Sequence, residues 1–309
     1  MDKKALFIRL SSLGDVVLAS CVIDPLIDLG YRPTLLTFAP YGELFEEDPR
    51  LDVLQVKKEE LFNVSVLEKL KDFDLYLDLH KNLKTLLLRL KLRGKWKSYN
   101  KQSIRRRLSV YFKSFRKPFS VVKAYLEPLG YKEGKPKILI SEKRLKNWKD
   151  KLGEYICIAV GARYEKKRYP YFRELSELFL KAGYRVVLVG DQRDRELTED
   201  WEGVINLCGE LSLLDTASVI KGALLFVGND SGLLHVARAV GTKAIQIYGG
   251  THPTLGFALE KDEGIVLFKG LDCQPCDIHG RGRCKFKTYP CLQFDPNYLF
   301  ETALSLLPS

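Results

Sequence analysis

The sequence predicts an α/β protein made of two doubly wound, parallel-sheet domains. Three observations favour this class: a length of 309 residues, alternating strand-length apolar runs and helical patterns, and a charged pause containing Gly and Pro at 133–152. A chain of this length exceeds the usual size of one core, so two domains are expected. We place the boundary so that one domain covers 1–150 and the other 151–309.

In the first half, apolar runs predict strands. Segments with a helical pattern lie between these runs or after them. The expected strands are 5–10, 34–38, 53–56 and 75–79. The expected helices are 16–29, 42–47, 65–71, 81–92, 103–115 and 119–129.

The second half repeats the pattern. The expected strands are 155–160, 185–189, 204–207, 224–227 and 244–248. The expected helices are 171–182, 193–201, 212–221 and 231–240. In parallel sheets ligands bind beyond the carboxyl ends of the strands, so two facing domains are expected to form a cleft between two such edges.

Composition indicates an ordinary globular protein, because 46% of the residues are hydrophobic and 29% are charged. No run approaches the roughly 18 apolar residues of a membrane-spanning helix, and no export signal is visible. An odd count of seven cysteines indicates a reducing compartment. We therefore expect a cytoplasmic protein.

The net charge of +11 comes from one segment. Residues 81–126 hold fifteen Lys or Arg and no Asp or Glu, which leaves 35 basic against 39 acidic residues elsewhere. Such a block attracts polyanions, namely nucleic acid, an anionic membrane surface or a phosphorylated substrate. The alternative is a solvated, lysine-rich helical face.

The stretch R-L-S-S-L-G-D-V-V-L-A-S, residues 9–20, places Asp15 at the start of a helix after the first strand. One interpretation is an N-cap, because Asp accepts hydrogen bonds from the first free N–H groups of a helix. The other is a general base. Both are compatible, since a carboxylate has about four lone-pair sites and a helix N-terminus keeps the acid ionised.

Two further stretches suit phosphate. After the strand that ends at 160, Lys166, Lys167 and Arg168 precede Tyr169 and a helix, and cations at a strand's carboxyl edge suit phosphate oxygens; the alternative is a basic loop in water. Residues 230–232, Asp-Ser-Gly, lead from a strand into a helix whose N-terminus is a ready anion site. His235 follows in the same helix. It is either part of this anion site or a residue that packs in the core.

Together the three stretches resemble glycosyltransferase family 9, the ADP-heptose:lipopolysaccharide heptosyltransferases. The shared patterns are R-x-S-S-x-G-D at the start, G-A-x(5)-K-R-Y-P at the opening of the second half and N-D-S-G-x-x-H-x-A-x-A-x-G near residue 230. The resemblance covers nearly the whole chain and implies the GT-B architecture, two facing Rossmann-like domains with a central cleft. It also implies a metal-independent, inverting transferase that uses ADP-heptose and needs no cofactor.

The resemblance implies roles for individual residues. Asp15 would deprotonate the acceptor hydroxyl, and Lys167 would hold the leaving diphosphate. The residues implied in donor binding are Asp194, Asp230, Ser231, Gly232, Leu233 and His235. One position departs from the family pattern: Arg163 stands where members commonly have Ser or Thr.

The implied acceptor is the Kdo/heptose inner core of lipopolysaccharide, dense in anions, so residues 1–150 would form the acceptor-binding domain and 151–309 the nucleotide-sugar-binding domain. The residues expected to face the acceptor are Lys81, Asn82, Lys84 and Arg105, with Arg106 and Arg107 as further candidates. The expected partners are the donor, the acceptor and the anionic inner-membrane surface, bound peripherally on its cytoplasmic face, and not nucleic acid.

Four cysteines form the pattern C-x₂-C-x₇-C-x₆-C at 273, 276, 284 and 291, which suits zinc by spacing alone. Heptosyltransferases have a similar tail without a catalytic metal being implied, and we assign no metal ligand. Two other functions stay open. One is a different GT-B sugar-nucleotide transferase, and the other is a non-catalytic basic protein that binds polyanions.

Overall fold

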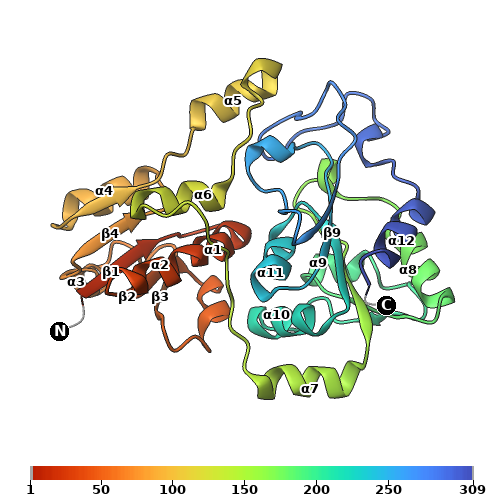
Figure 1. Ribbon diagram of the computed structural model, residues 1–309, viewed down its shortest axis with the longest axis horizontal. Helices are drawn as coiled ribbons and strands as arrows, with labels where there is room; N and C mark the ends of the chain where they lie inside the picture. Colours follow the sequence, from red (N-terminus) through yellow and green to blue (C-terminus); the bar gives the residue numbers. More distant parts are fainter. Residues whose placement is uncertain (1–2, 308–309) are drawn as a thin grey trace. The chain divides into compact units, whose positions relative to one another are not determined.

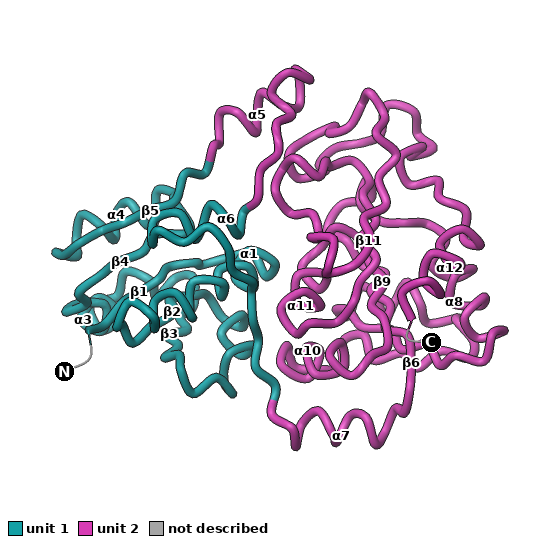
Figure 2. Tube along the Cα trace, in the orientation of Figure 1, with its two compact units in different colours: residues 1–101, 121–140 teal, residues 102–120, 141–309 magenta. Residues whose placement is uncertain are grey.

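The computed structural model describes residues 3–307, which form two compact units (Figures 1 and 2). Within these residues the first unit comprises 3–101 and 121–140, and the second comprises 102–120 and 141–307. This division differs from the expected boundary at 150/151 in two places. Helix α7 (Glu142–Leu152) groups with the second unit, and so does the excursion 102–120 within the basic segment.

The first unit is built on a parallel sheet of five strands in the order β3-β2-β1-β4-β5. The strands are β1 (Lys3–Ile8), β2 (Tyr31–Phe38), β3 (Asp52–Val56), β4 (Leu75–Asp78) and β5 (Trp96–Ser98). The helices are α1 (Leu13–Ala19), η1 (Ser20–Val22), α2 (Ile23–Asp28), η2 (Tyr41–Phe45), α3 (Val64–Lys69), α4 (Leu83–Lys91), α6 (Val121–Leu126) and η4 (Glu127–Leu129).

Alternation along β1 assigns its side chains to two cores, because successive residues of a strand point to opposite faces. Leu6 and Ile8 share a core with Leu70, which follows α3, and with Leu88 of α4. The helices α1 and α2 precede β2 in the chain, and α1 contacts α6. Ala5 and Phe7, on the other face of β1, are fully buried as well, so the apolar run is buried on both faces, as expected for a parallel sheet.

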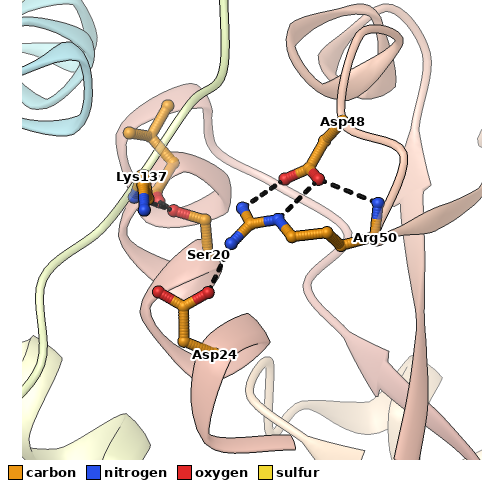
Figure 3. Close-up of polar contacts among 6 residues, drawn as sticks. Ser20, Asp24, Asp48, Arg50 and Lys137 are labelled. Carbon is orange, nitrogen blue, oxygen red and sulfur yellow. Dashed lines mark hydrogen bonds and ion pairs between the residues drawn. The ribbon is translucent and has the colours of Figure 1, made fainter. Parts of the chain in front are cut away.

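Two sets of polar contacts tie the outer segments of the first unit to η1 and α2 (Figure 3). The buried Asp48 carboxylate accepts from the Arg50 guanidinium at 2.7 and 2.8 Å, and Arg50 also reaches Asp24 of α2 at 2.5 Å. The Ser20 hydroxyl accepts from the backbone N–H of Lys137 at 2.8 Å. The return segment 121–140 is thereby joined to η1.

The second unit is built on a parallel sheet of six strands in the order β11-β10-β9-β6-β7-β8. The strands are β6 (Tyr155–Ala159), β7 (Arg185–Leu188), β8 (Ile205–Asn206), β9 (Leu225–Asn229), β10 (Ala244–Ile247) and β11 (Gly264–Leu267). Besides α7, the helices are α5 (Ser103–Tyr111), η3 (Lys113–Phe115), η5 (Glu165–Lys167), α8 (Phe172–Lys181), α9 (Gln192–Glu196), α10 (Leu213–Gly222), α11 (Gly232–Val240), η6 (Pro253–Leu255), η7 (Pro290–Leu292) and α12 (Pro296–Leu304).

Helices cover both faces of this sheet. Figure 1 shows α8 and α12 on one face and α10 and α11 on the other. Phe172 and Phe179 of α8 and Leu299 of α12 belong to the same buried core as Ile156 and Ile158 of β6. Both faces of β6, β9 and β10 are buried, which explains why these strands form continuous apolar runs in the sequence.

Each sheet reverses its strand order at one point, between β1 and β4 in the first unit and between β6 and β9 in the second. Counted from the first strand of its own unit, each sheet has the order 3-2-1-4-5, with a sixth strand in the second. The loops after the two central strands diverge at such a switch point and leave a crevice where ligands bind. The topology therefore points to two places in the chain, one per unit.

Candidate functional site

At the switch point of the first unit, Asp15 is the third residue of α1, just beyond the carboxyl end of β1. Its Oδ1 lies 2.8 Å from Nη2 of Arg9, and its Oδ2 accepts a hydrogen bond from the Ser12 hydroxyl at 2.9 Å. The side chain is 20% exposed. The N-cap interpretation of Asp15 is wrong, because Ser12 occupies the N-cap position.

Arg9 is the buried residue that holds Asp15, a role that was not predicted from the sequence. Its Nη1 donates to the carbonyl of Leu79, after β4, at 2.6 Å, and its guanidinium lies 5.9 Å from the ring centroid of Tyr125 in α6. Burial on its own lowers the pKa of Arg9, but the Asp15 carboxylate together with Tyr125 and Tyr99 outweighs it, so the pKa is raised overall. The sequence does contain a signal for this role, because Arg9 is a cation within the apolar run 5–10.

His80 is a second residue of this site that sequence reasoning missed. It follows β4, and its backbone N–H donates to Oδ1 of Asp78 at 2.9 Å. Burial, then the positive charges of Arg9 and Lys101, lower the pKa of His80 to about 4, although Asp15 opposes them. The imidazole is therefore neutral at physiological pH and offers one donor and one acceptor.

The three expected acceptor residues of the first unit lie between the end of β4 and the first turn of α4, and each has a partner within the unit. Lys81 donates through Nζ to the carbonyl of Tyr99 at 3.1 Å. Asn82 caps α4 by accepting from the N–H of Thr85 at 3.1 Å. The ammonium of Lys84 lies 5.0 Å from the ring centroid of Phe38.

Arg105, the fourth expected acceptor residue, lies in α5 and so groups with the second unit rather than with the other three. Its Nη1 donates to the carbonyl of Lys117 at 2.7 Å, and its guanidinium lies 5.4 Å from the ring centroid of Phe119. Both contacts fix the excursion 102–120. Among its neighbours, Arg106 is buried, whereas Arg107 is exposed.

At the switch point of the second unit, Lys167 and Asp230 form an ion pair with 2.9 Å between Nζ and Oδ2. Lys167 ends the short turn η5 that follows β6, and Asp230 directly follows β9. The side chains are 17% and 7% exposed, so the interpretation of this stretch as a basic loop in water is wrong for Lys167. The same finding holds for Lys166, which is buried.

Asp230 has three donors around its carboxylate. Besides Lys167, the Thr251 hydroxyl donates to Oδ2 at 2.8 Å and the Gln246 amide donates to Oδ1 at 3.2 Å. Burial on its own raises the pKa of Asp230, but Lys167 and these contacts outweigh it and the pKa is lowered. The carboxylate is therefore held ionised and turned toward Lys167.

Asn229 fixes the loop that carries Lys167. Its side-chain oxygen accepts from the N–H of Tyr169 at 2.9 Å, and its amide nitrogen donates to the carbonyls of Val160 and Gly161 at 3.0 and 3.1 Å. The loops after β6 and β9 are thus joined at the switch point. From the sequence, Asn229 was predictable only as a member of the motif near residue 230.

The N-terminus of α11 follows Asp230 directly. Ser231 occupies the N-cap position, and Gly232 and Leu233 begin the helix; all three are half-buried. The first N–H groups of a helix have no partner within it and carry a partial positive charge. His235 is buried with its ring 5.8 Å from that of Phe257, which agrees with the packing interpretation.

Asp194 is the third residue of α9, the helix after β7, and forms a capping box with Asp191, whose N–H donates to Oδ2 of Asp194 at 3.0 Å. Burial raises the pKa of Asp194. The carboxylate packs so closely on Gly161 that a Cβ there would be 2.2 Å from Oδ2. Arg163, in the neighbouring loop, has its guanidinium 5.5 Å from the ring centroid of Tyr164.

The four cysteines of the C-terminal segment carry free thiols; Cys291 is buried and the others are half-buried. Burial and the neighbouring thiols raise the pKa of Cys291 to about 12. Within residues 3–307, His, Cys, Asp and Glu side chains form no group of three or more that is placed to hold a metal ion. Over the same residues no helix has the length and hydropathy needed to cross a bilayer.

Comparison with known proteins places this chain among glycosyltransferases. Residues 67–285 match the model of glycosyltransferase family 9 (heptosyltransferase). Lipopolysaccharide heptosyltransferase 2 of Escherichia coli K12 is 35% identical over 98 residues, which is 28% of either chain. The corresponding protein of Salmonella typhimurium is 30% identical over 137 residues, 40% of this chain and 38% of that one. The matched segments thus span well under two thirds of these relatives.

Solved structures share the fold over nearly the whole chain. A family 9 glycosyltransferase of Veillonella parvula has a TM-score of 0.77 at 20% identity and covers 99% of this chain and 98% of its own. Escherichia coli ADP-heptose LPS heptosyltransferase II has a TM-score of 0.74 at 19% identity, with 98% of both chains covered. The two parallel-sheet α/β units and this likeness confirm the GT-B fold class that the sequence predicts.

Proposed function

From the premise that the chain belongs to glycosyltransferase family 9, we propose that it transfers heptose from ADP-heptose to the Kdo/heptose inner core of lipopolysaccharide with inversion. The names of its relatives support the sugar and the acceptor. The observation that carries the proposal is the Lys167–Asp230 ion pair beside the N-terminus of α11, at a topological switch point. Cations and free N–H groups so placed suit a diphosphate.

On the donor side, Lys167 stabilises the departing ADP. An ammonium has three N–H donors, and one is directed at Asp230, so two remain for phosphate oxygens. The N-terminus of α11 adds roughly half a positive charge to the full charge of the lysine. Asp230 then acts as a positioning residue for Lys167. Its carboxylate already accepts from three donors and would repel an anionic ligand, so it does not contact the diphosphate itself.

Ser231, Gly232 and Leu233 supply the helix N-terminus to the donor, and His235 packs behind it. Asp194 is proposed to reach the ribose from the first turn of α9, although its carboxylate takes part in the capping box. Lys167 and the helix end supply the positive charge that a metal ion would otherwise bring. We therefore propose metal-independent transfer.

On the acceptor side, Asp15 removes the proton of the attacking hydroxyl. Arg9 stabilises the negative charge of the carboxylate and Ser12 sets its orientation, while the remaining lone pairs can accept the proton. The acceptor oxygen forms a bond to the anomeric carbon as the bond to ADP breaks. The proton stays on Asp15 and the electron pair leaves with the diphosphate, and a single displacement inverts the anomeric centre.

The acceptor is proposed to contact Lys81, Asn82 and Lys84 in the first unit and Arg105 in the second. Its lipid part places the enzyme at the anionic, cytoplasmic face of the inner membrane. A segment with fifteen cations and no acid among residues 81–126 suits both the sugar acids and the lipid phosphates.

Incubation with ADP-heptose and defined truncated core acceptors tests the proposal, with product mass and anomeric configuration as readouts. ADP at a hundredfold excess over its Kd should stabilise the protein by about 2.7 kcal/mol in a thermal shift. A stabilisation that any polyanion reproduces, and that salt removes equally in each case, supports the polyanion-binding alternative instead.

A further inference from the structure

Helix α4 exposes a row of leucines to solvent. Leu83, Leu86, Leu87 and Leu90 are 70%, 52%, 39% and 76% exposed. At about 100° per residue they share an arc of roughly 100° on the helix. The opposite side, with Leu88 and the following Leu92, is buried in the core of the first unit. The helix thus has an apolar face inward and a second one outward.

Such exposure is concentrated in one part of the chain. Of the fourteen large apolar side chains that are exposed among residues 3–307, eight lie between 83 and 115. Monomeric soluble proteins rarely expose contiguous apolar rows, and those that do usually bind something there.

Cations border the outward leucines on both sides. Arg89 and Lys91 are exposed and project roughly 100° to either side of the row, and Arg93 and Lys95 follow the helix. Residues 79–126 contain no Asp or Glu, so no acidic side chain of this segment offsets them. Apolar side chains between cations match the acyl boundary and the headgroup phosphates of an anionic bilayer.

We propose that α4 docks in the plane of an anionic lipid surface, with Leu83, Leu86, Leu87 and Leu90 in the acyl boundary and Arg89 and Lys91 among the lipid phosphates. A second copy of this chain is the poorer occupant, because two such faces would oppose cation to cation with no acid to pair them. This inference rests on the proposed function, because that function supplies a lipid-borne acceptor. It deepens the function by naming the element that binds the lipid surface.

Vesicle co-sedimentation of the full chain tests the proposal without any need for transfer activity. The probes are vesicles of phosphatidylcholine alone and of phosphatidylcholine mixed with phosphatidylglycerol. The wild type should bind the mixed vesicles and not the neutral ones. The variant Leu86→Ser/Leu90→Ser should weaken this binding by about tenfold, and Arg89→Gln/Lys91→Gln should weaken it and reduce its salt dependence.

A matched control removes two exposed apolar side chains elsewhere in the first unit, Ile27→Ser/Leu29→Ser at the end of α2, and should bind as the wild type does. Turnover of a core acceptor without lipid should also be unchanged in Leu86→Ser/Leu90→Ser. If no acceptor is turned over by any variant, the proposed function fails while the vesicle result still stands.

Three results would overturn the inference. The wild type does not bind mixed vesicles, or Leu86→Ser/Leu90→Ser binds them as well as the wild type, which assigns the attraction to charge alone. In the third, the wild type self-associates in sedimentation equilibrium, and the leucine variant becomes monomeric with unchanged vesicle binding. The leucine row is then an interface between copies.

Discussion

Replacing Lys167 by Met removes one partner of a buried ion pair and leaves Asp230 with a charge that nothing neutralises. Breaking such a pair costs about 3–5 kcal/mol. The lower end applies here, because Thr251 and Gln246 still donate to the carboxylate at 2.8 and 3.2 Å. A loss of about 3 kcal/mol corresponds to a fall in Tm of roughly 6–12 °C for a unit of this size.

The double variant Lys167→Met/Asp230→Asn separates stability from catalysis. The amide carries no charge, so most of the lost Tm should return. The transfer rate should not return. Losing a preorganised contact to the leaving diphosphate costs about 10² to 10³ in kcat, and we expect that loss in both variants.

Calorimetry gives Tm, and release of ADP at saturating donor gives kcat. A control is Lys71→Met, whose partner Glu68 is exposed and whose ion pair is worth under about 1 kcal/mol. Recovery of kcat together with Tm in the double variant would refute the reasoning, because Lys167 would then serve only to neutralise Asp230.

Three further predictions follow from the same contacts. Asp15→Asn should nearly abolish turnover and leave the thermal shift with ADP unchanged; loss of both together would remove Asp15 from the chemistry. The pKa of His80, lowered to about 4 by burial and then by Arg9, means that only the unfolded chain binds this proton between about pH 6.5 and 4. The free energy of unfolding should therefore fall as pH drops through that window, and less steeply in His80→Gln, as pH-dependent calorimetry can measure. Gly249→Ala would place a Cβ 1.9 Å from the carbonyl oxygen of Lys166, so the loop carrying Lys167 must shift, with an expected cost of about 1–3 kcal/mol in denaturant unfolding and a lower kcat.

The elements that sequence reasoning predicted are those with strong local patterns. Nine of the eleven strands found among residues 3–307 correspond to expected apolar runs, because strands buried on both faces contain few polar residues. The missed β5 has only three residues, of which the middle one is Lys97, and β11 is a short run after a turn. Helix α7 was missed because it is rich in charge and lies in the charged segment taken as the domain boundary. Helix α12 was also missed, although Asp295 and Pro296 are signals of a helix start.

The pairs that build the two sites were not predictable in this way. Lys167 and Asp230 are 63 positions apart, and only the adjacency of β6 and β9 in the sheet brings them to 2.9 Å. Arg9 and Asp15 are close in sequence, but the ion pair depends on the direction that β1 and α1 impose. The outward leucines of α4 likewise depend on which side of the helix meets the sheet.

The two switch points use one topology in two ways, and this difference accounts for the roles proposed for them. In the first unit the helix after the switch point contains its own anion in the first turn, since Asp15 is the third residue of α1. In the second unit the carboxylate of Asp230 precedes the helix and accepts from Lys167, Thr251 and Gln246. The N-terminus of α11 therefore stays available for an anion from a ligand. A helix end that carries a carboxylate in its own first turn disfavours a phosphate there, whereas a helix end without one favours it. A fixed carboxylate suits proton removal from the acceptor, and an open helix end beside a lysine suits the departing diphosphate.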